Sequence, residues 1–336
     1  MKALVTGGGG FLGSVIVRML RERGDEVVSF SRTDHPLLAP LGVTQLRGDL
    51  ADHKAVTAAA QGCDIVFHVA AKAGIWGPYA GYHAANVTGT ESVLAACRAH
   101  GIRRLVATGS PSVVFDGSDI EGGDESLPYP RHFGAHYPLT KMLAERLVLQ
   151  ANSPELATVS LRPHLIWGPG DNHLLPRIID KARSGRLKRI GQRPCTVDTV
   201  YVDNAARAHL LAAELLAPDS VIAGKAYFIT NGEPLPLWEL VNRMLAAAGM
   251  APVTATVSTG TAKAVALLYE FLWQLCRLPG EPPLTRFVVN ELSTDHWFDI
   301  GAARRELGYE PEISIEEGLR RLQEWLPVSG LLAEKR

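Results

Sequence analysis

Tyr137 and Lys141 stand four positions apart in the stretch AHYPLTKMLAE, with Pro138 between them. Residues at this spacing share one face of a helix, so an ammonium group is expected within a few ångströms of a phenol. Pro138 suits the first helical turn, where its missing N–H costs no hydrogen bond. A phenol with an ordinary pKa of about 10 exchanges protons more readily near neutral pH when a cation lowers that pKa. The pair is therefore a candidate proton donor, although a solvated tyrosine and lysine on an ordinary helix would show the same spacing.

A glycine-rich stretch, VTGGGGFLG, provides a second chemical feature near the N-terminus. It follows an apolar strand pattern and precedes a helical pattern, which is the context that a dinucleotide-binding loop requires. Glycines here permit a tight turn and a close approach of the backbone to a pyrophosphate, and the helix N-terminus offers free N–H groups to the phosphates. We predict that a dinucleotide is bound by Gly7, Gly10, Phe11, Leu12 and Gly13.

The end of the second expected strand selects the cofactor. NAD enzymes usually carry an acidic residue about 20 residues beyond the glycines, where it binds the ribose hydroxyl. Here the stretch SFSRTDH places Ser31 and Arg32 at that point. A guanidinium and a hydroxyl can bind a 2′-phosphate that a carboxylate would repel. The sequence therefore predicts NADP(H) in preference to NAD(H), and Asp34 keeps NAD(H) open as the alternative.

The elements that would position these residues alternate between strand and helix. Strands are expected at residues 2–5, 26–30, 44–48, 64–70, 103–110 and 157–167. Helical patterns separate them, including residues 11–23, residues 86–100 and the helix of Tyr137. This alternation predicts an α/β fold with a doubly wound parallel sheet.

The pattern changes after Trp167, where the Gly- and Pro-rich stretch GPGDNHLLP reads as a loop that leaves the sheet. The chain is expected to return through a helix at 204–216, which Asp203 could N-cap, and a strand at 225–230. At 336 residues the chain exceeds one ordinary domain. We predict that residues 1–167 plus about 201–230 form a dinucleotide-binding domain. Residues of about 168–200 plus 231–336 would form a smaller C-terminal substrate lobe.

Composition excludes several classes of function. The 34 Lys and Arg balance 35 Asp and Glu, so the chain lacks the basic footprint of a nucleic-acid-binding protein. The four cysteines form no C-x-x-C pair, and His164 and His173 lack an H-E-x-x-H context, so no metal site or disulfide framework is predicted. The N-terminus shows no signal-peptide pattern, and no apolar run reaches the length of a membrane span, about 18 residues. A cytoplasmic location is expected.

Several motifs occur in an order that resembles a known family. The glycine loop is followed by GDL, HVAA, ATGSPSVVF and YPLTK, as in an extended short-chain dehydrogenase/reductase. The later motifs LRPHLIWGPGDNHLLP, TVYVDNAARAHLLA and WFDIGAARRELGYEP narrow the resemblance to the 3β-hydroxysteroid dehydrogenase-like branch. The resemblance covers most of the chain. It implies an NAD(P)-binding Rossmann fold and an oxidoreductase acting on CH–OH or C=O groups.

The resemblance also assigns roles to individual positions. Tyr137 and Lys141 match the catalytic Y-x-x-x-K motif, and Ser110 matches the catalytic serine. The chain departs from the family pattern at Gly109, where a serine is usual, and Ser112 competes with Ser110 for the role. Coenzyme contacts are implied for Asp49 and Leu50 at the adenine, and for Ala70, Ala71, Lys72, Asn86, Pro163 and His164.

The resemblance further implies the reaction. NADPH would reduce the 3-keto group of a long-chain 2-alkyl-3-keto acid to the 2-alkyl-3-hydroxy acid, in bacterial olefin biosynthesis. Tyr137 would protonate the ketone oxygen, Ser110 would donate a second hydrogen bond to it, and Lys141 would also bind the nicotinamide ribose. Assembly with other enzymes of that pathway is implied, and a homo-oligomer is a further option.

Other functions remain open or are disfavoured. A sterol or steroid 3β-hydroxy dehydrogenase is the main alternative, since that branch shares the same motifs. A dehydratase is disfavoured because Pro111 and Ser112 stand where an Asp-Glu pair is expected. A hydrolase would need the G-x-S-x-G motif, which is absent. A non-catalytic NADP(H)-binding regulator is the remote alternative, because such proteins usually lose the tyrosine and the lysine.

The segment 262–278 is strongly apolar. Its polar residues Lys263, Glu270, Gln274 and Arg277 fall on one narrow helical stripe. Three interpretations stay open for the broad apolar face: core or subunit packing, a lid or wall for long acyl chains, and peripheral membrane contact. The cation that would bind a substrate carboxylate is equally open, with Arg177 and Arg286 as candidates.

Overall fold

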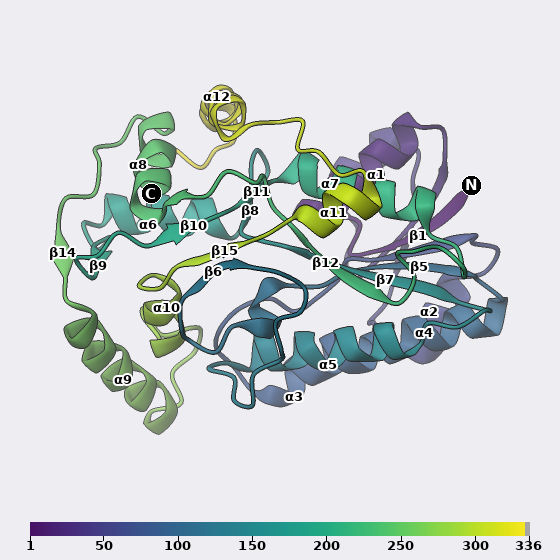
Figure 1. Ribbon diagram of the computed structural model, residues 1–336, viewed down its shortest axis with the longest axis horizontal. Coiled ribbons are helices and arrows are strands. Elements are labelled where there is room, and N and C mark those ends of the chain that lie inside the picture. Colours follow the sequence, from purple (N-terminus) through teal and green to yellow (C-terminus); the bar gives the residue numbers. More distant parts are fainter. Residues whose placement is uncertain (333–336) are drawn as a thin grey trace.

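The computed structural model describes residues 1–332 and places one large sheet in the half of the molecule that holds the N-terminus (Figure 1). Its strands are parallel and follow the order β12-β7-β5-β4-β1-β2-β3. They are β1 (Lys2–Thr6), β2 (Glu26–Ser31), β3 (Thr44–Arg47), β4 (Ile65–His68), β5 (Arg104–Thr108), β7 (Ala157–Pro163) and β12 (Lys225–Ile229). The strand order reverses between β1 and β4, as in a Rossmann fold. The predicted fold class is confirmed.

Helices cover both faces of this sheet (Figure 1). One face carries α1 (Phe11–Glu22) and α7 (Val202–Leu215), and the other carries α2 (His53–Ala59), α4 (Gly89–His100) and α5 (His136–Gln150). Successive side chains of a strand point to opposite faces, so Ala3 and Val5 of β1 enter one apolar cluster and Leu4 enters the other. Because both faces are covered, β4 and β7 are buried along their whole length.

Two predicted elements differ in extent. The strand expected at 157–167 is interrupted at Leu165, whose φ of 41° lies in the left-handed region, so β7 ends at Pro163 and the short β8 (Ile166–Trp167) follows. The helix expected at 86–100 begins earlier, because α3 (Tyr79–Tyr82) and a π-helical segment η2 (His83–Thr88) run directly into α4. Both irregularities lie beside the carboxyl ends of central strands.

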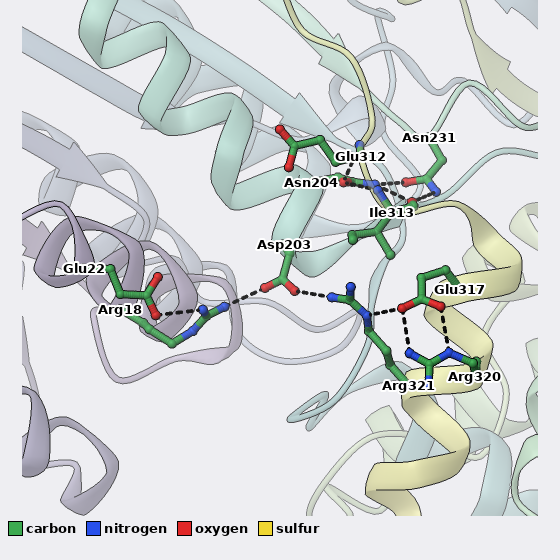
Figure 2. Close-up of polar contacts among 10 residues, drawn as sticks. All are labelled: Arg18, Glu22, Asp203, Asn204, Asn231, Glu312, Ile313, Glu317, Arg320 and Arg321. Atoms are coloured by element: carbon green, nitrogen blue, oxygen red, sulfur yellow. Dashed lines mark hydrogen bonds and ion pairs between the residues drawn. The ribbon is translucent and has the colours of Figure 1, made fainter.

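The proposed N-cap of the helix after Tyr201 is wrong. The cap position is Tyr201 itself, and Asp203 lies inside the first turn of α7. Its carboxylate pairs instead with Arg18 of α1 at 2.8 Å and with Arg321 at 3.5 Å (Figure 2). Arg321 belongs to α12 (Ile315–Trp325), so Asp203 connects the last helix to the first.

A smaller sheet lies beside the large one. Its order is β13 (Leu235–Pro236), β10 (Thr196–Val197), β15 (His296–Phe298) and β6 (Ile120–Gly123), so the segment before α5 contributes a strand to it. The remaining elements are β9 (Arg189–Ile190), β11 (Val200–Tyr201), β14 (Thr256–Val257), α6 (Leu174–Arg183), α8 (Leu237–Ala247), α9 (Thr259–Leu275), α10 (Arg286–Glu291), α11 (Gly301–Leu307), and the 3₁₀ turns η1 (Pro36–Leu41), η3 (Pro111–Val114) and η4 (Leu326–Val328). The exact division into the two predicted domains stays a prediction.

Candidate active site

A cavity of about 1160 Å³ lies at the carboxyl ends of the central strands. Open α/β sheets bind their ligands at this edge, where the strand order reverses. The predicted site residues on its wall are Gly7, Gly10, Phe11, Leu12, Gly13, Ser31, Arg32, Asp49, Leu50, Ala70, Ala71, Lys72, Ser110, Ser112, Tyr137, Lys141, Pro163 and His164. The fold thus brings together residues that are far apart in the sequence, and their individual roles stay predictions.

The glycine loop leaves room only for backbone. Gly7 has a φ of +69°, and a Cβ there would lie 2.9 Å from Cα of Ala70. A Cβ on Gly13 would lie 2.1 Å from the carbonyl oxygen of Gly7. Within the described chain, no side chain caps the first turn of α1, whose residues line the cavity. The loop therefore fits the pyrophosphate of a dinucleotide at a helix N-terminus.

The end of β2 carries Ser31 and Arg32, the residues predicted to select the cofactor. Arg32 lines the cavity, whereas the nearby Asp34 forms an ion pair with Arg47, 3.7 Å from Oδ2 to Nε. The hydroxyl oxygen of Ser31 is buried and has no hydrogen-bond partner within residues 1–332. A buried hydroxyl without a partner is costly unless a ligand supplies one. Ser31 and Arg32 fit a bound phosphate group.

Asn86 differs from the other predicted coenzyme contacts, because it is buried behind the cavity wall. Its Oδ1 accepts from the backbone N–H of Lys72 at 2.7 Å, and its Nδ2 donates to the carbonyl of Lys72 and to Oγ1 of Thr140. These bonds use both N–H donors of the amide and one of the two lone pairs of its oxygen. Asn86 therefore holds the loop after β4 against α5 and lies outside the cavity wall that residues 1–332 define, and its contact with the coenzyme stays a prediction.

Ser110 and Tyr137 form the polar pair at the centre of the cavity. The backbone of Ser110 is extended and precedes η3, and its Oγ lies 2.8 Å from Oγ of Ser112. Burial raises the pKa of Tyr137, while the hydrogen bond with the Ser110 hydroxyl lowers it. The pair places two hydroxyl groups where both can reach one ligand oxygen.

Lys141 reaches a different partner from the one predicted. Its Nζ donates to the carbonyl oxygen of Thr108 at 2.6 Å, at the end of β5. Burial lowers the pKa of this ammonium to about 8, and the carboxylate of Glu145 acts in the opposite direction. The predicted lowering of the Tyr137 pKa by the lysine is not confirmed, because burial has the largest effect on the phenol and the ammonium is bound to β5.

Gly109 has a steric reason for departing from the family pattern. A Cβ at this position would lie 2.7 Å from Oγ of Ser160 and 2.8 Å from Oε2 of Glu145. Glu145 forms a buried ion pair with Arg162, 2.7 Å from Oε1 to Nη2, and accepts from Ser160 as well. A serine side chain at position 109 would collide with this network, which joins α5 to β7.

Glu291 and His296 line the cavity and were missed by the sequence analysis. Burial raises the pKa of the Glu291 carboxyl to about 7, and its charge raises the pKa of Tyr137. Phe115 and Phe298 add apolar surface at the same end. Glu291 and His296 are more than 150 positions from Tyr137 in the sequence, and the only quoted motif near them was WFDI, which follows His296.

His164 belongs to a buried hydrogen-bonded chain. Its Nδ1 lies 2.6 Å from Oδ1 of Asp198, and its Nε2 lies 3.2 Å from Nδ1 of His296. Nε2 of His296 lies 2.7 Å from the backbone carbonyl of Glu291, which only accepts, so this nitrogen carries the proton. Burial lowers the pKa of His296 to about 3, so its ring is neutral and its Nδ1 accepts. Both ring nitrogens of His164 therefore lie against hydrogen-bond acceptors, the Asp198 carboxylate and Nδ1 of His296.

The two arginines considered for a substrate carboxylate lie elsewhere. Arg177 pairs with Glu281 at 2.8 Å, and Arg286 pairs with Glu270 at 2.7 Å. Neither belongs to the cavity wall formed by residues 1–332. Lys72 is on that wall, and its Nζ lies 4.7 Å from the centre of the Tyr82 ring.

Comparisons with known proteins define the class. Residues 4–257 match the 3-beta hydroxysteroid dehydrogenase/isomerase family. The chain is 56% identical over 325 residues to a 2-alkyl-3-oxoalkanoate reductase of Stenotrophomonas maltophilia, covering 96% of this chain and 98% of that one. It is 36% identical to a 3-beta-hydroxysteroid dehydrogenase of Mycolicibacterium neoaurum, covering 95% of this chain and 89% of that one. The chain therefore belongs to the 3-beta hydroxysteroid dehydrogenase/isomerase family.

A solved structure shares the fold. MoeE5 in complex with UDP-glucuronic acid and NAD superimposes with a TM-score of 0.75 at 26% identity, covering 98% of this chain and 100% of that one. The predicted resemblance is confirmed, and the protein is an oxidoreductase.

Proposed function

We propose that this protein uses NADPH to reduce the 3-keto group of a long-chain 2-alkyl-3-keto acid, giving the 2-alkyl-3-hydroxy acid, as a step of bacterial olefin biosynthesis. The observation that carries the proposal is that the hydroxyl groups of Ser110 and Tyr137 lie on the wall of the same cavity as the glycine loop, near enough for the serine to affect the pKa of the phenol. The name of the Stenotrophomonas relative supports this choice of substrate.

The side chains divide the work of a ketone reduction. NADPH, when bound, supplies the hydride that adds to the carbonyl carbon. The Tyr137 hydroxyl donates a proton to the carbonyl oxygen, and the Ser110 hydroxyl donates a hydrogen bond to the same oxygen. Removing one donor of this kind costs about 3 kcal/mol of transition-state stabilisation. Because burial raises its pKa, Tyr137 stays protonated at neutral pH and can act as the acid.

The preference for NADPH is supported by three side chains. Arg32 and Ser31 line the cavity, and Asp34 is paired with Arg47. The NAD named in the MoeE5 complex supports a nicotinamide dinucleotide in general. We expect Arg32→Ala to raise the Kd for NADPH at least tenfold, since a charge-assisted contact with phosphate is lost, and to leave the Kd for NADH nearly unchanged. Quenching of protein fluorescence on titration with each cofactor measures both constants, and an equal effect on the two would contradict the phosphate site.

The substrate is tested by following NADPH absorbance with a racemic long-chain 2-alkyl-3-keto acid. The matched control is the ketone that forms when this acid loses its carboxyl group, because 3-keto acids lose carbon dioxide readily. Faster consumption with the acid than with the ketone supports the proposal. Equal rates would mean that the carboxylate is not recognised.

A 3-keto steroid tests the second candidate, a sterol or steroid 3β-hydroxy dehydrogenase, which the Mycolicibacterium relative supports. Turnover with the steroid and none with the keto acid would overturn the proposed substrate while leaving the roles of Tyr137 and Ser110 intact. No turnover with either would point to a non-catalytic NADP(H)-binding protein.

A further inference from the structure

Helix α9 turns its large apolar side chains outward. Leu267, Leu268, Phe271 and Leu275 are each more than half exposed. Their spacing of three and four residues makes one continuous stripe, which we call the α9 face. Figure 1 shows α9 at the edge of the molecule, beside α10. Single exposed leucines are ordinary, but a contiguous stripe of this kind marks an interaction surface.

The opposite side of α9 explains this orientation. Ala262 and Ala266 are buried and pack with Ile190 and Val289. Glu270, the only acidic residue of α9, is 7% exposed and accepts from the backbone N–H and the Nε of Arg286, both at 2.7 Å. The four residues of the predicted polar stripe therefore do not all face solvent, because the Glu270 carboxylate is bound to Arg286 of α10.

The α9 face does not fit a wall of the active-site cavity. Residues 259–278 are absent from the cavity lining that residues 1–332 define. The buried side of α9 packs against α10, which carries Glu291 of the cavity wall, so one helix separates the α9 face from the cavity. It is an outer surface beside the site.

A positively charged segment adjoins the start of α9. Residues 177–189 contain six Lys and Arg against one Asp. This basic segment spans α6 and β9, and β9 pairs with β14, which leads directly into α9. Residues 259–286 add three cations against two acids. The whole chain has a formal charge of -1, so the residues outside these two segments carry an excess of acidic groups.

We propose that the α9 face and the basic segment 177–189 dock together on an anionic lipid surface. The apolar stripe enters the boundary between headgroups and acyl chains, and the cations attract anionic headgroups. A second copy of the chain fits less well, because a two-fold interface brings the same patch of both copies together and would face two basic segments. Docking would bring the substrate end of the cavity close to the surface from which a greasy substrate is taken.

The test is co-sedimentation of the full-length protein with vesicles of phosphatidylcholine alone, or mixed with phosphatidylglycerol. We expect at least tenfold stronger binding to the anionic vesicles and loss of that difference at high salt. Leu268→Ser with Phe271→Ser should reduce the binding at least tenfold, as should Arg186→Glu with Lys188→Glu. Leu37→Ser with Val328→Ser removes two apolar residues that lie elsewhere and are also more than half exposed, and this variant should bind as the natural protein does.

The readout needs no turnover, so it is independent of the proposed function. Light scattering of each variant, together with unchanged thermal unfolding, separates loss of docking from loss of structure. Equal sedimentation with both kinds of vesicle, or undiminished binding of the Leu268→Ser, Phe271→Ser variant, would overturn the proposal. So would an absence of vesicle binding together with an oligomer that this variant dissociates, because a second copy would then cover the face.

Discussion

Tyr137 lies between influences of opposite sign. Burial and the nearby Glu291 carboxylate raise its pKa, and the Ser110 hydroxyl lowers it. The phenol is therefore protonated at neutral pH, which is the form that a ketone reduction needs. Lys141 is bound to the carbonyl of Thr108, so it fixes α5 against β5.

The first prediction concerns this phenol. Tyr137→Phe should lower kcat by about 10²–10⁴-fold, because the proton donor is lost. The affinity for NADPH should stay the same, since the ring is retained. Steady-state kinetics and a cofactor titration measure the two effects. Ser110→Ala should be more damaging than Ser112→Ala, and the reverse order would assign the second hydrogen bond to Ser112.

Glu291 gives a pH-dependent prediction for stability. Its pKa is raised from 4.5 to about 7 in the folded protein, so the folded protein binds this proton more tightly than the unfolded chain does. The stabilising contribution is present below about pH 4.5 and is lost as pH rises through 7. At pH 8, Glu291→Gln should therefore be more stable than the natural protein by up to about 3 kcal/mol. Below pH 4.5, the stabilities of the two proteins should change with pH in nearly the same way.

Urea unfolding of both proteins at several pH values measures this effect. The difference in free energy of unfolding should change between pH 5 and pH 8. Parallel curves over that range would mean that the carboxyl titrates normally in the fold.

At the scale of elements, the position of α5 depends on its contact with β5 and β7. Glu145 of α5 is 3% exposed and pairs with Arg162 of β7. Separating the two members of a buried ion pair leaves an uncompensated charge, so a side chain that pushes Glu145 away from Arg162 would destabilise the fold. Gly109 at the end of β5 leaves the space that the pair needs.

Gly109→Ser should therefore lower the free energy of unfolding by about 1–3 kcal/mol, the usual cost of an overpacked core. Gly260→Ser is the matched control, because a Cβ there meets only Ser258 Oγ at 4.0 Å. Chemical denaturation compares the two variants with the natural protein. Equal stability of both would show that the network around Glu145 can move aside.

At the scale of the whole molecule, the C-terminal part is tied to the large sheet by buried amides (Figure 2). Asn204 of α7 donates to the carbonyl of Ile313 at 2.7 Å and to Oδ1 of Asn231 at 2.9 Å. Its own Oδ1 accepts from the backbone N–H groups of Glu312 and Ile313. One side chain thus satisfies backbone groups that are more than 100 residues away in the sequence.

Asn204→Ala should lower the free energy of unfolding by about 3 kcal/mol, because partly buried backbone groups lose their partner. Asp203→Asn, one position earlier, breaks ion pairs that are open to solvent and should cost less than about 1 kcal/mol. Urea unfolding measures both. A larger loss for Asp203→Asn would show that the surface ion pairs, and not the amides, hold α12 in place.

Local spacing was enough to predict the large sheet, the glycine loop and the helix that carries Tyr137 and Lys141. Each of these depends on neighbours a few residues apart, so the period of the strand or helix and the freedom of glycine define them. The N-cap assigned to Asp203 failed because the carboxylate found partners on α1 and α12, and no local pattern reports such partners.

The sequence by itself determined which residues share a face, and the tertiary structure decided which face is covered. For α9 the spacing defined an apolar stripe, but only the packing of Ala266 and Glu270 on α10 turned it to solvent. Glu291 and His296 reach the cavity for a similar reason, because contacts between distant segments depend on how the elements pack. Periodicity is a property of the chain, whereas burial is a property of what the rest of the chain places against it.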